Sequence, residues 1–566
     1  MHSLKRIPVG LEDFKEIIDK GYYFVDKTLL IKDILDGNSK VSLVTRPRRF
    51  GKTLNMSMIQ RFFEKTEENN EYLFEGLKIT SEDKKYLDHQ GKYPVITVSL
   101  KSMKQSSYEY AFSEWKNNVI REFIRHTDVL SSEEILPYER KRFEAVIADE
   151  ADDVVYFTAL RFLSECLKKY YKKNVILLVD EYDVPLENAY FCGFYDKMTD
   201  LVRSVLESVL KTNPSLEFAV LTGCLRISKE SIFTGLNNLG VYPITESRLS
   251  EYYGFTQDEV KKMAEEFDLL ERLPEMKKWY NGYIFGQTEI YNPWSIVQYM
   301  ASANGGNKIP CKPYWINTSS NSIIHQLILQ SDEKTKKKIE DLMAGKSIKA
   351  PVNENTVYSD INVNKEDIWS FLLFTGYLKQ VDSEFKNLRT YSEMVIPNLE
   401  VMTVYEQTVM NWFDDMIIKE RTPELLCAFI EEDTQKVQSE INRWLRKSIS
   451  FYDSAENFYH GFLLGALLGN DEYEIKSNRE NGDGRTDITI CEFQTRRLGI
   501  VIEIKIAGSF HELDKMCDKA LMQIEERQYG EQLLEDCYEK VIKYGIAFCG
   551  KSCKIKTGKS LSGCLF

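Results

Sequence analysis

A glycine, a lysine and a threonine in succession are the most distinctive chemical feature of the sequence. Gly51, Lys52 and Thr53 follow a short apolar run over 41–44, which is typical of a buried strand. In a phosphate-binding loop the glycine lets backbone N–H groups approach the phosphates, the lysine pairs with the β- and γ-phosphate oxygens, and the hydroxyl holds Mg²⁺. The generic pattern has its first glycine where Arg46 stands. The segment predicts a nucleoside triphosphate site with Mg²⁺ at the start of a helix.

Two adjacent acids end a second apolar run, as such a site requires. Asp180 and Glu181 follow the run 175–179, whose lack of polar alternation suits a parallel strand buried on both faces. We expect Asp180 to coordinate Mg²⁺ and Glu181 to activate the attacking water. A strand that merely ends in a turn is the alternative for this segment alone. The order of the two segments in the chain favours the nucleotide site.

A third buried strand, predicted over 217–222, also ends in polar residues. Some NTPases insert an extra strand beside the phosphate loop, and a polar side chain at its end senses the γ-phosphate. Thr222 and Arg226 are the candidates for this role, since a cation near transferring phosphate has a large electrostatic effect. The alternative is a turn at Gly223 with a solvated Arg226.

A second group of charged residues lies near the end of the chain. Glu503 and Lys505 are two residues apart in the apolar segment 499–506, and Asp487 precedes Glu503 by one hairpin length. With a side-chain period of two, Glu503 and Lys505 share one face of a strand. We predict that Asp487 and Glu503 hold Mg²⁺ and that Lys505 orients or activates a water. An internal ion pair on an edge strand is the alternative.

The elements that must position these residues follow from the apolar patterns. Up to about residue 260 the sequence alternates between strands and helices, as in a parallel α/β sheet. A helical insertion is expected around 108–155, and an aromatic, glycine-rich segment over 277–293 indicates a change of domain. A length of 566 residues predicts about three or four domains. The boundaries that we predict are 1–265, 266–400 and 401–566.

Composition narrows the class of protein. A net charge of −13 excludes a uniformly basic surface for nucleic acid, although it allows a local basic groove. The sequence has no apolar run long enough to cross a membrane and no signal-peptide pattern at its start. Its 11 cysteines are scattered without a framework spacing, which predicts a reducing, cytoplasmic location without membrane attachment.

Taken together, the motifs resemble the bacterial AAA-ATPase-like family, whose members carry a C-terminal domain of the PD-(D/E)xK nuclease superfamily. The resemblance covers essentially the whole chain, and in this family the first glycine of the phosphate loop is commonly replaced. The segments that carry the resemblance are 23–28, 45–53, 179–183, 221–227, 236–238 and 280–283. The resemblance implies an N-terminal P-loop NTPase, a mostly helical, winged-helix-like middle domain, and a C-terminal α/β restriction-endonuclease-like domain.

The resemblance also extends the set of predicted site residues. It implies that Glu456, at the start of a helix before the core strands, lends a further acid to the nuclease metal. The predicted nucleotide-binding residues are Arg46, Arg48, Arg49, Phe50, Gly51, Lys52, Thr53, Leu54, Asp180, Thr222 and Arg226.

The function expected from these features is ATP binding and hydrolysis, with Mg²⁺, coupled to a metal-dependent nuclease that acts on nucleic acid, DNA being favoured over RNA. The alternative is a nucleotide-dependent signalling or interaction switch whose nuclease-like domain binds without cleaving. A phosphotransferase is a weaker third hypothesis, because the sequence shows no acceptor pocket. The sequence predicts no oligomeric state.

Overall fold

The structure is a computed structural model that describes residues 5–227, 232–233, 236, 239–303, 309–315, 332–355, 358, 366–406, 423–447, 456–467, 473–481, 484–492 and 496–562. The chain divides into two compact units. The first comprises residues 1–320 and 347–403, and the second comprises residues 321–346 and 404–566. No helix among the described residues is both long enough and apolar enough to span a membrane.

The core of the first unit is a five-stranded parallel sheet in the order β2-β3-β4-β1-β5. Each strand corresponds to an apolar run that the sequence marks as a strand. The inserted strand β4 lies between β1 and β3, which confirms the extra strand expected beside the phosphate loop. The strands are β1 Val41–Thr45, β2 Val95–Ser99, β3 Val175–Asp180, β4 Leu216–Gly223 and β5 Leu239–Tyr242.

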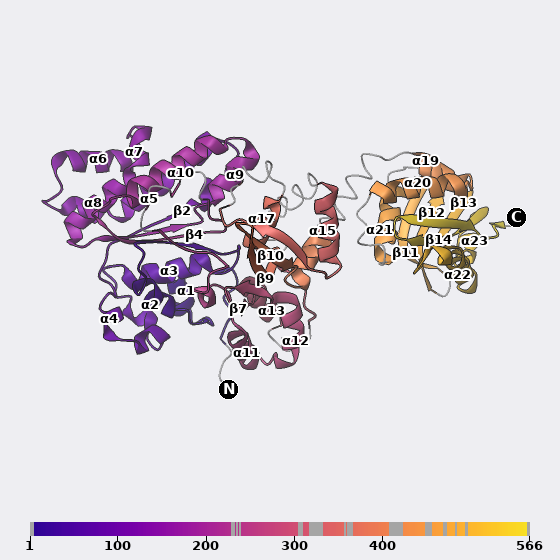
Figure 1. The fold of residues 1–566 in the computed structure, drawn as a ribbon, viewed down its shortest axis with the longest axis horizontal. Helices are drawn as coiled ribbons and strands as arrows, with labels where there is room; N and C mark the ends of the chain where they lie inside the picture. Colours follow the sequence, from indigo (N-terminus) through magenta and orange to yellow (C-terminus); the bar gives the residue numbers. More distant parts are fainter. Residues whose placement is uncertain are drawn as a thin grey trace. The chain divides into compact units, whose positions relative to one another are not determined.

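Helices cover both faces of this sheet. In Figure 1, α5, α8 and α10 lie on one side of the sheet and α1, α2 and α3 on the other. The insertion expected around 108–155 is helical and consists of α5, α6 and α7. The helices are α1 Phe14–Asp19, α2 Leu29–Leu35, α3 Lys52–Phe63, α4 Lys84–Leu87, α5 Tyr108–Arg125, α6 Pro137–Ile147, α7 Asp153–Phe157, α8 Ala159–Tyr171, α9 Val184–Cys192 and α10 Tyr195–Leu210.

The rest of the first unit is largely helical. A buried apolar cluster joins α11, α12 and α13 to the N-terminal segment through residues such as Met263, Tyr280 and Ile7. A small antiparallel sheet in the order β8-β10-β9 and the hairpin β6-β7 accompany these helices. The elements are α11 Gln257–Glu266, α12 Leu273–Tyr280, β6 Tyr283–Phe285, β7 Thr288–Ile290, α13 Pro293–Ala303, β8 Ile348–Val352, α17 Asp367–Phe374, β9 Lys379–Lys386 and β10 Arg389–Val395.

The second unit is built on a mixed sheet in the order β11-β12-β13-β14-β15, with β16 paired to β14. Helix α22 connects the parallel strands β13 and β14 and packs on both. The elements are α15 Glu333–Met343, α19 Pro423–Ile430, α20 Thr434–Lys447, α21 Glu456–Leu467, β11 Tyr473–Asn481, β12 Gly484–Glu492, β13 Leu498–Ile506, α22 Leu513–Glu526, α23 Glu531–Glu535, β14 Lys540–Cys549, β15 Ser552–Thr557 and β16 Leu561–Ser562. The parallel sheet, the helical middle and this C-terminal sheet confirm the predicted fold class.

A buried carboxyl group in the first unit makes the stability of the fold depend on pH. Glu400 is fully buried and accepts hydrogen bonds from the Ser295 hydroxyl, at 2.7 Å, and from the backbone N–H groups of Tyr314 and Trp315. Burial raises the pKa of Glu400 to about 7 in spite of these hydrogen bonds. The folded chain therefore holds this proton over a range of pH in which the unfolded chain has released it.

We expect Glu400→Gln to remove part of the pH dependence of stability. Since the pKa of a free glutamate is near 4.5, the stabilising effect of the proton is complete below that pH and is lost as the pH rises towards 7. A shift of this size corresponds to about 3 kcal/mol of unfolding free energy. Urea unfolding followed by tryptophan fluorescence at pH 5 and pH 8 measures the change. Glu265→Gln, at an exposed position, should keep the wild-type dependence.

Candidate nucleotide site and candidate metal centre

The phosphate loop joins β1 to α3 and encloses the side chain of Lys52. Gly51 adopts a φ of 79°, in the left-handed region that glycine enters without strain, and forms the N-cap of α3. The Lys52 ammonium is buried and donates hydrogen bonds to the backbone carbonyls of Arg46 and Pro47, both at 3.1 Å. Its nearest carboxylate is Glu181, at 3.8 Å. This position at a helix start is where a loop lysine can reach phosphate oxygens.

The charge on Lys52 is maintained by its neighbours. Burial acts to lower the pKa of this lysine, but the acidic groups of Cys224, Glu181 and Asp183 outweigh burial, so the pKa is raised. Lys52 is therefore a cation inside the loop, and a change of pH near neutrality does not alter its charge.

A threonine and an aspartate meet beside this lysine. The Thr53 hydroxyl donates to Asp180 Oδ2 at 2.7 Å, and the Thr222 hydroxyl donates to Asp180 Oδ1. Burial and the adjacent charge of Glu181 raise the pKa of Asp180. Mg²⁺ is usually held by one or two carboxylates, a hydroxyl and substrate phosphates rather than by a cage of protein ligands. The oxygens of Thr53 and Asp180 fit this requirement.

The Glu181 carboxylate lies beside Lys52, next to Thr53 and Asp180. The Glu181 backbone has a φ of 57°, and its N–H donates to the Thr222 hydroxyl at 3.4 Å. The structure thus brings together Lys52, Thr53, Asp180 and Glu181, which come from two segments of the chain about 130 residues apart. Thr222 joins them because β4 lies between β1 and β3.

The side chain of Arg46 points away from this site. Its guanidinium is fully buried and donates to the backbone carbonyls of Thr45, Tyr242 and Leu249, at 2.7 to 3.2 Å. It also lies against the rings of Tyr253 and Phe285. We assigned Arg46 to nucleotide binding from the sequence, but its side chain does not line the cavity at the loop. In this arrangement Arg46 anchors the loop to the segment that follows β5.

The next two arginines connect the loop to other parts of the first unit. Arg48 forms an ion pair with Glu187 on α9, and the Tyr358 hydroxyl donates to the same carboxylate at 3.2 Å. The Arg49 guanidinium stacks over the indole ring of Trp294 on α13, with 4.3 Å between the group and the ring centroid. Both arginines line the cavity at the loop.

Phe50 and Leu54 complete the set of predicted loop residues. Phe50 is fully buried and packs edge-on against the ring of Tyr283 on β6, although it also borders the cavity. Leu54 lines the cavity from the first turn of α3. Arg46 and Phe50 thus both contact β6, whereas Pro47 lies against Gly376.

Two residues that the sequence analysis did not assign hold the end of β4 in place. The Asp183 carboxylate accepts hydrogen bonds from the backbone N–H groups of Cys224 and Leu225, at 2.8 and 2.9 Å. The Tyr182 hydroxyl donates to the Leu225 carbonyl. Gly223 is required here, because a Cβ would lie only 2.6 Å from the Tyr182 ring. The available signal was two polar residues, Tyr and Asp, directly after the acid pair.

Burial also affects the Asp183 carboxyl, whose pKa it raises to about 6, with the charge of Glu181 acting in the same direction.

Arg226 lies on the segment that Tyr182 and Asp183 hold. It is half-buried and does not line the cavity at the loop. Its contact with a γ-phosphate stays a prediction.

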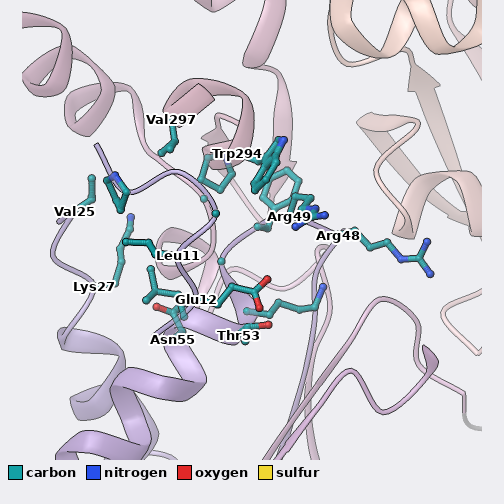
Figure 2. Close-up of a pocket in the computed structure, with 18 of the residues that line it drawn as sticks. Leu11, Glu12, Val25, Lys27, Arg48, Arg49, Thr53, Asn55, Trp294 and Val297 are labelled. Carbon is teal, nitrogen blue, oxygen red and sulfur yellow. The ribbon is translucent and has the colours of Figure 1, made fainter. Parts of the chain in front are cut away.

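A cavity of about 320 Å³ opens directly on the loop. One end is formed by the loop and the start of α3, from Gly51 to Asn55, and contains the charged side chains described above. The other end is apolar. Figure 2 shows Val297 and Trp294, from α13, and Leu11 and Val25, from the N-terminal segment, around the same cavity. The volume lies in the range of small-ligand sites in proteins.

The candidate metal centre of the second unit lies on neighbouring strands. Ile488 on β12 pairs with Ile502 on β13, so Asp487 and Glu503 are adjacent across the two strands. The backbone N–H of Ile504 donates to Asp487 Oδ2 at 2.8 Å. The Lys505 ammonium lies 2.9 Å from Glu503 Oε1. The structure therefore brings Asp487, Glu503 and Lys505 together, as their spacing predicts.

The carboxylate of Glu503 is 1% exposed, whereas Lys505 reaches towards the surface. A buried carboxylate is costly unless a cation or hydrogen bonds compensate its charge. The two carboxylates supply the oxygen ligands that a hard divalent cation takes, and Lys505 compensates part of the charge of Glu503. Among the described residues no group of three or more His, Cys, Asp or Glu side chains forms a ready metal cage. Carboxylates and phosphate oxygens would share such an ion.

The helix before these strands is α21, which begins at Glu456 as the resemblance implies. The position of the Glu456 side chain lies outside the described part of the structure, so its role as a metal ligand stays a prediction. His460, one turn later, contacts the backbone carbonyl of Asp487 through Nε2, at 2.7 Å. This histidine connects α21 to the strand that carries Asp487.

These features define a P-loop NTPase of the class that places β4 between β1 and β3. The features are the parallel sheet with its inserted strand, the phosphate loop and the adjoining acids. Family models match the chain in two regions. Residues 8–233 match predicted AAA-ATPase, and residues 454–558 match the PD-(D/E)XK nuclease superfamily. The N-terminal region is therefore similar to the predicted AAA-ATPases, and the C-terminal region is similar to the PD-(D/E)XK nuclease superfamily.

One relative covers nearly the whole chain. It is described as "Uncharacterized protein in vnfD 5'region", from Azotobacter chroococcum mcd 1, and is 24% identical over 554 residues, or 94% of each chain.

Proposed function

We propose that the chain binds and hydrolyses ATP at the phosphate loop and that its second unit is a magnesium-dependent nuclease acting on nucleic acid, with DNA favoured. The observation that supports the first part most directly is the approach of Lys52, Thr53, Asp180 and Glu181. The cluster of Asp487, Glu503 and Lys505 supports the second part.

In the ATPase reaction each of these residues would have a separate role. Lys52 and the N–H groups at the start of α3 would hold the β- and γ-phosphates. Glu181 would accept a proton from the attacking water. Thr53 and Asp180 would hold Mg²⁺, which neutralises charge on the phosphates when bound. Thr222, bonded to Asp180, would keep that carboxylate in place.

In the nuclease reaction Asp487 and Glu503 would hold Mg²⁺, with Glu456 as a further candidate ligand. Mg²⁺, when bound, lowers the pKa of its water and offsets charge on the scissile phosphate. Lys505 would orient that water and supply a positive charge close to the phosphate. The Ile504 N–H would fix the direction of the Asp487 carboxylate.

ATP would act on the nuclease by shifting a population of conformations. Arg48 is paired with Glu187 on α9, to which Tyr358 also donates, and Arg49 lies over the Trp294 ring on α13. These contacts are a route by which bound phosphate could change the rest of the first unit. A nucleotide-dependent switch that binds nucleic acid without cleaving it is the second candidate function, and the net charge of −13 favours it.

Two assays on the purified chain test the proposal. Phosphate release from ATP with Mg²⁺ measures the first activity, and nicking of supercoiled plasmid with Mg²⁺, with and without ATP, measures the second. We expect both activities, each abolished by EDTA. ATP hydrolysis without any nicking of DNA or RNA would favour the switch, and the absence of both activities would contradict the proposal as a whole.

A further inference from the structure

The apolar end of the cavity at the loop has no part in holding phosphate. Its walls come from three separate parts of the first unit: the N-terminal segment with Leu11 and Val25, helix α11 with Met263, and helix α13 with Trp294 and Val297. These residues surround the space that continues from Gly51–Asn55 (Figure 2). A ligand that fills the whole cavity therefore needs an anionic end and an apolar, flat end.

Lys27, a charged residue in the wall of the apolar end, already has partners. The Lys27 ammonium is buried and donates to the Glu259 carboxylate and to the Glu251 carbonyl, both at 2.6 Å. Burial lowers the pKa of Lys27, and the charge of Glu259 acts against this change. Because Glu259 compensates the charge of Lys27, that end of the cavity favours an uncharged group over a second anion.

One face of the Trp294 indole lies against the phosphate loop. The Arg49 guanidinium covers it at 4.3 Å from the ring centroid, and Arg49 belongs to the loop that would hold the phosphates. An aromatic ring is a good surface for a nucleobase, because every base has a flat face that can stack.

We propose that the apolar end of this cavity receives the purine base of the nucleotide and that Trp294 and Val297 are the residues that contact it. The inference rests on the proposed function, since the phosphates must lie on Gly51–Thr53 for the base to reach this end. A purine fills the apolar walls more completely than a pyrimidine does. Bound nucleotide then joins α13 to the N-terminal segment, which are separated by more than 250 residues in the sequence.

The test separates binding of the base from binding of the phosphates. Dissociation constants are measured by titration calorimetry on the full chain with Mg²⁺, using ATP, CTP and inorganic triphosphate, which has phosphates but no base. We expect Val297→Asp and Trp294→Ala to weaken ATP binding by about tenfold or more and to leave triphosphate binding unchanged. Wild-type chain should bind ATP more tightly than CTP. Val154→Asp is the matched control, because this valine is 71% exposed and lies outside the cavity.

The outcomes distinguish this inference from the function on which it rests. Equal binding of ATP and inorganic triphosphate by the wild type, or unchanged ATP binding by both variants, would overturn the base site and leave the phosphate site standing. Failure of both ligands to bind would overturn the nucleotide site and the base site together. Thermal unfolding gives a second readout, since ATP, as the tighter ligand, should raise the midpoint of the first unit more than triphosphate does at equal ligand concentration.

Discussion

Replacing Lys52 with alanine is expected to reduce ATP hydrolysis by about 100-fold or more. The ammonium is a permanent cation held inside the loop, 3.1 Å from the carbonyls of Arg46 and Pro47, and it would exchange these contacts for phosphate oxygens. Removing it takes away the positive charge that stabilises the triphosphate in the transition state. Steady-state phosphate release, measured at saturating ATP and again at low ATP, gives kcat and kcat/KM.

Two further variants separate the loss of charge from damage to the loop. Lys52→Met keeps most of the apolar stem of the buried side chain, so it should fold like the wild type and still lose hydrolysis. Lys32→Ala removes a partly exposed lysine that is paired with Glu82, and it should keep full activity. Wild-type hydrolysis by Lys52→Met would show that the chain turns over ATP without this cation, or at another site.

The strands that carry the ATPase residues were predictable because a strand buried on both faces appears in the sequence as a continuous apolar run. β3 is buried at all six positions, and the run 175–180 is apolar until its final aspartate. The same reasoning predicted the strand β4, whereas its position beside β1 was expected from NTPases that insert an extra strand there. On β13, the period of two placed Glu503 and Lys505 on one face, and the structure has them in contact.

Contacts between distant segments correspond to no such run. No pattern in the sequence indicates that the two terminal nitrogens of the Arg46 guanidinium donate to three backbone carbonyls, one of them from Leu249, about 200 residues away. A charged side chain beside a phosphate loop is more simply read as a phosphate ligand. The residues of the cavity walls could not be predicted from the sequence either, because Val25 and Val297 line the same cavity only through the packing of α13.

The positions of Tyr182 and Asp183 show why the local motif was only partly understood. Each is adjacent to the acid pair, and each bonds to the segment after β4 rather than to the site itself. The partners of Asp183 are backbone N–H groups, which no side-chain pattern reveals. The motif therefore combines two functions, since Asp180 and Glu181 face the loop while the next two residues hold the end of the inserted strand.

The second large effect is expected in the second unit, where Lys505→Ala should reduce plasmid nicking by about 100-fold or more and leave ATP hydrolysis at the wild-type rate. Lys505 is the cation 2.9 Å from a carboxylate that is almost wholly buried. It would both position that carboxylate and orient the attacking water. Nicking is measured by the conversion of supercoiled plasmid at fixed Mg²⁺, and hydrolysis by phosphate release from the same preparation.

Loss of a cation beside a buried carboxylate can also destabilise the unit, by about 3 kcal/mol or more, so a variant of nearly equal shape is needed. Asp487→Asn keeps an oxygen for the Ile504 N–H but removes the charge that would bind Mg²⁺, and it should abolish nicking in a chain with wild-type thermal stability. Lys540→Ala is the control, because this exposed lysine at the start of β14 is paired with Glu432. Undiminished nicking by both Lys505→Ala and Asp487→Asn would place the cleavage, if the wild type shows it, at a different group of residues.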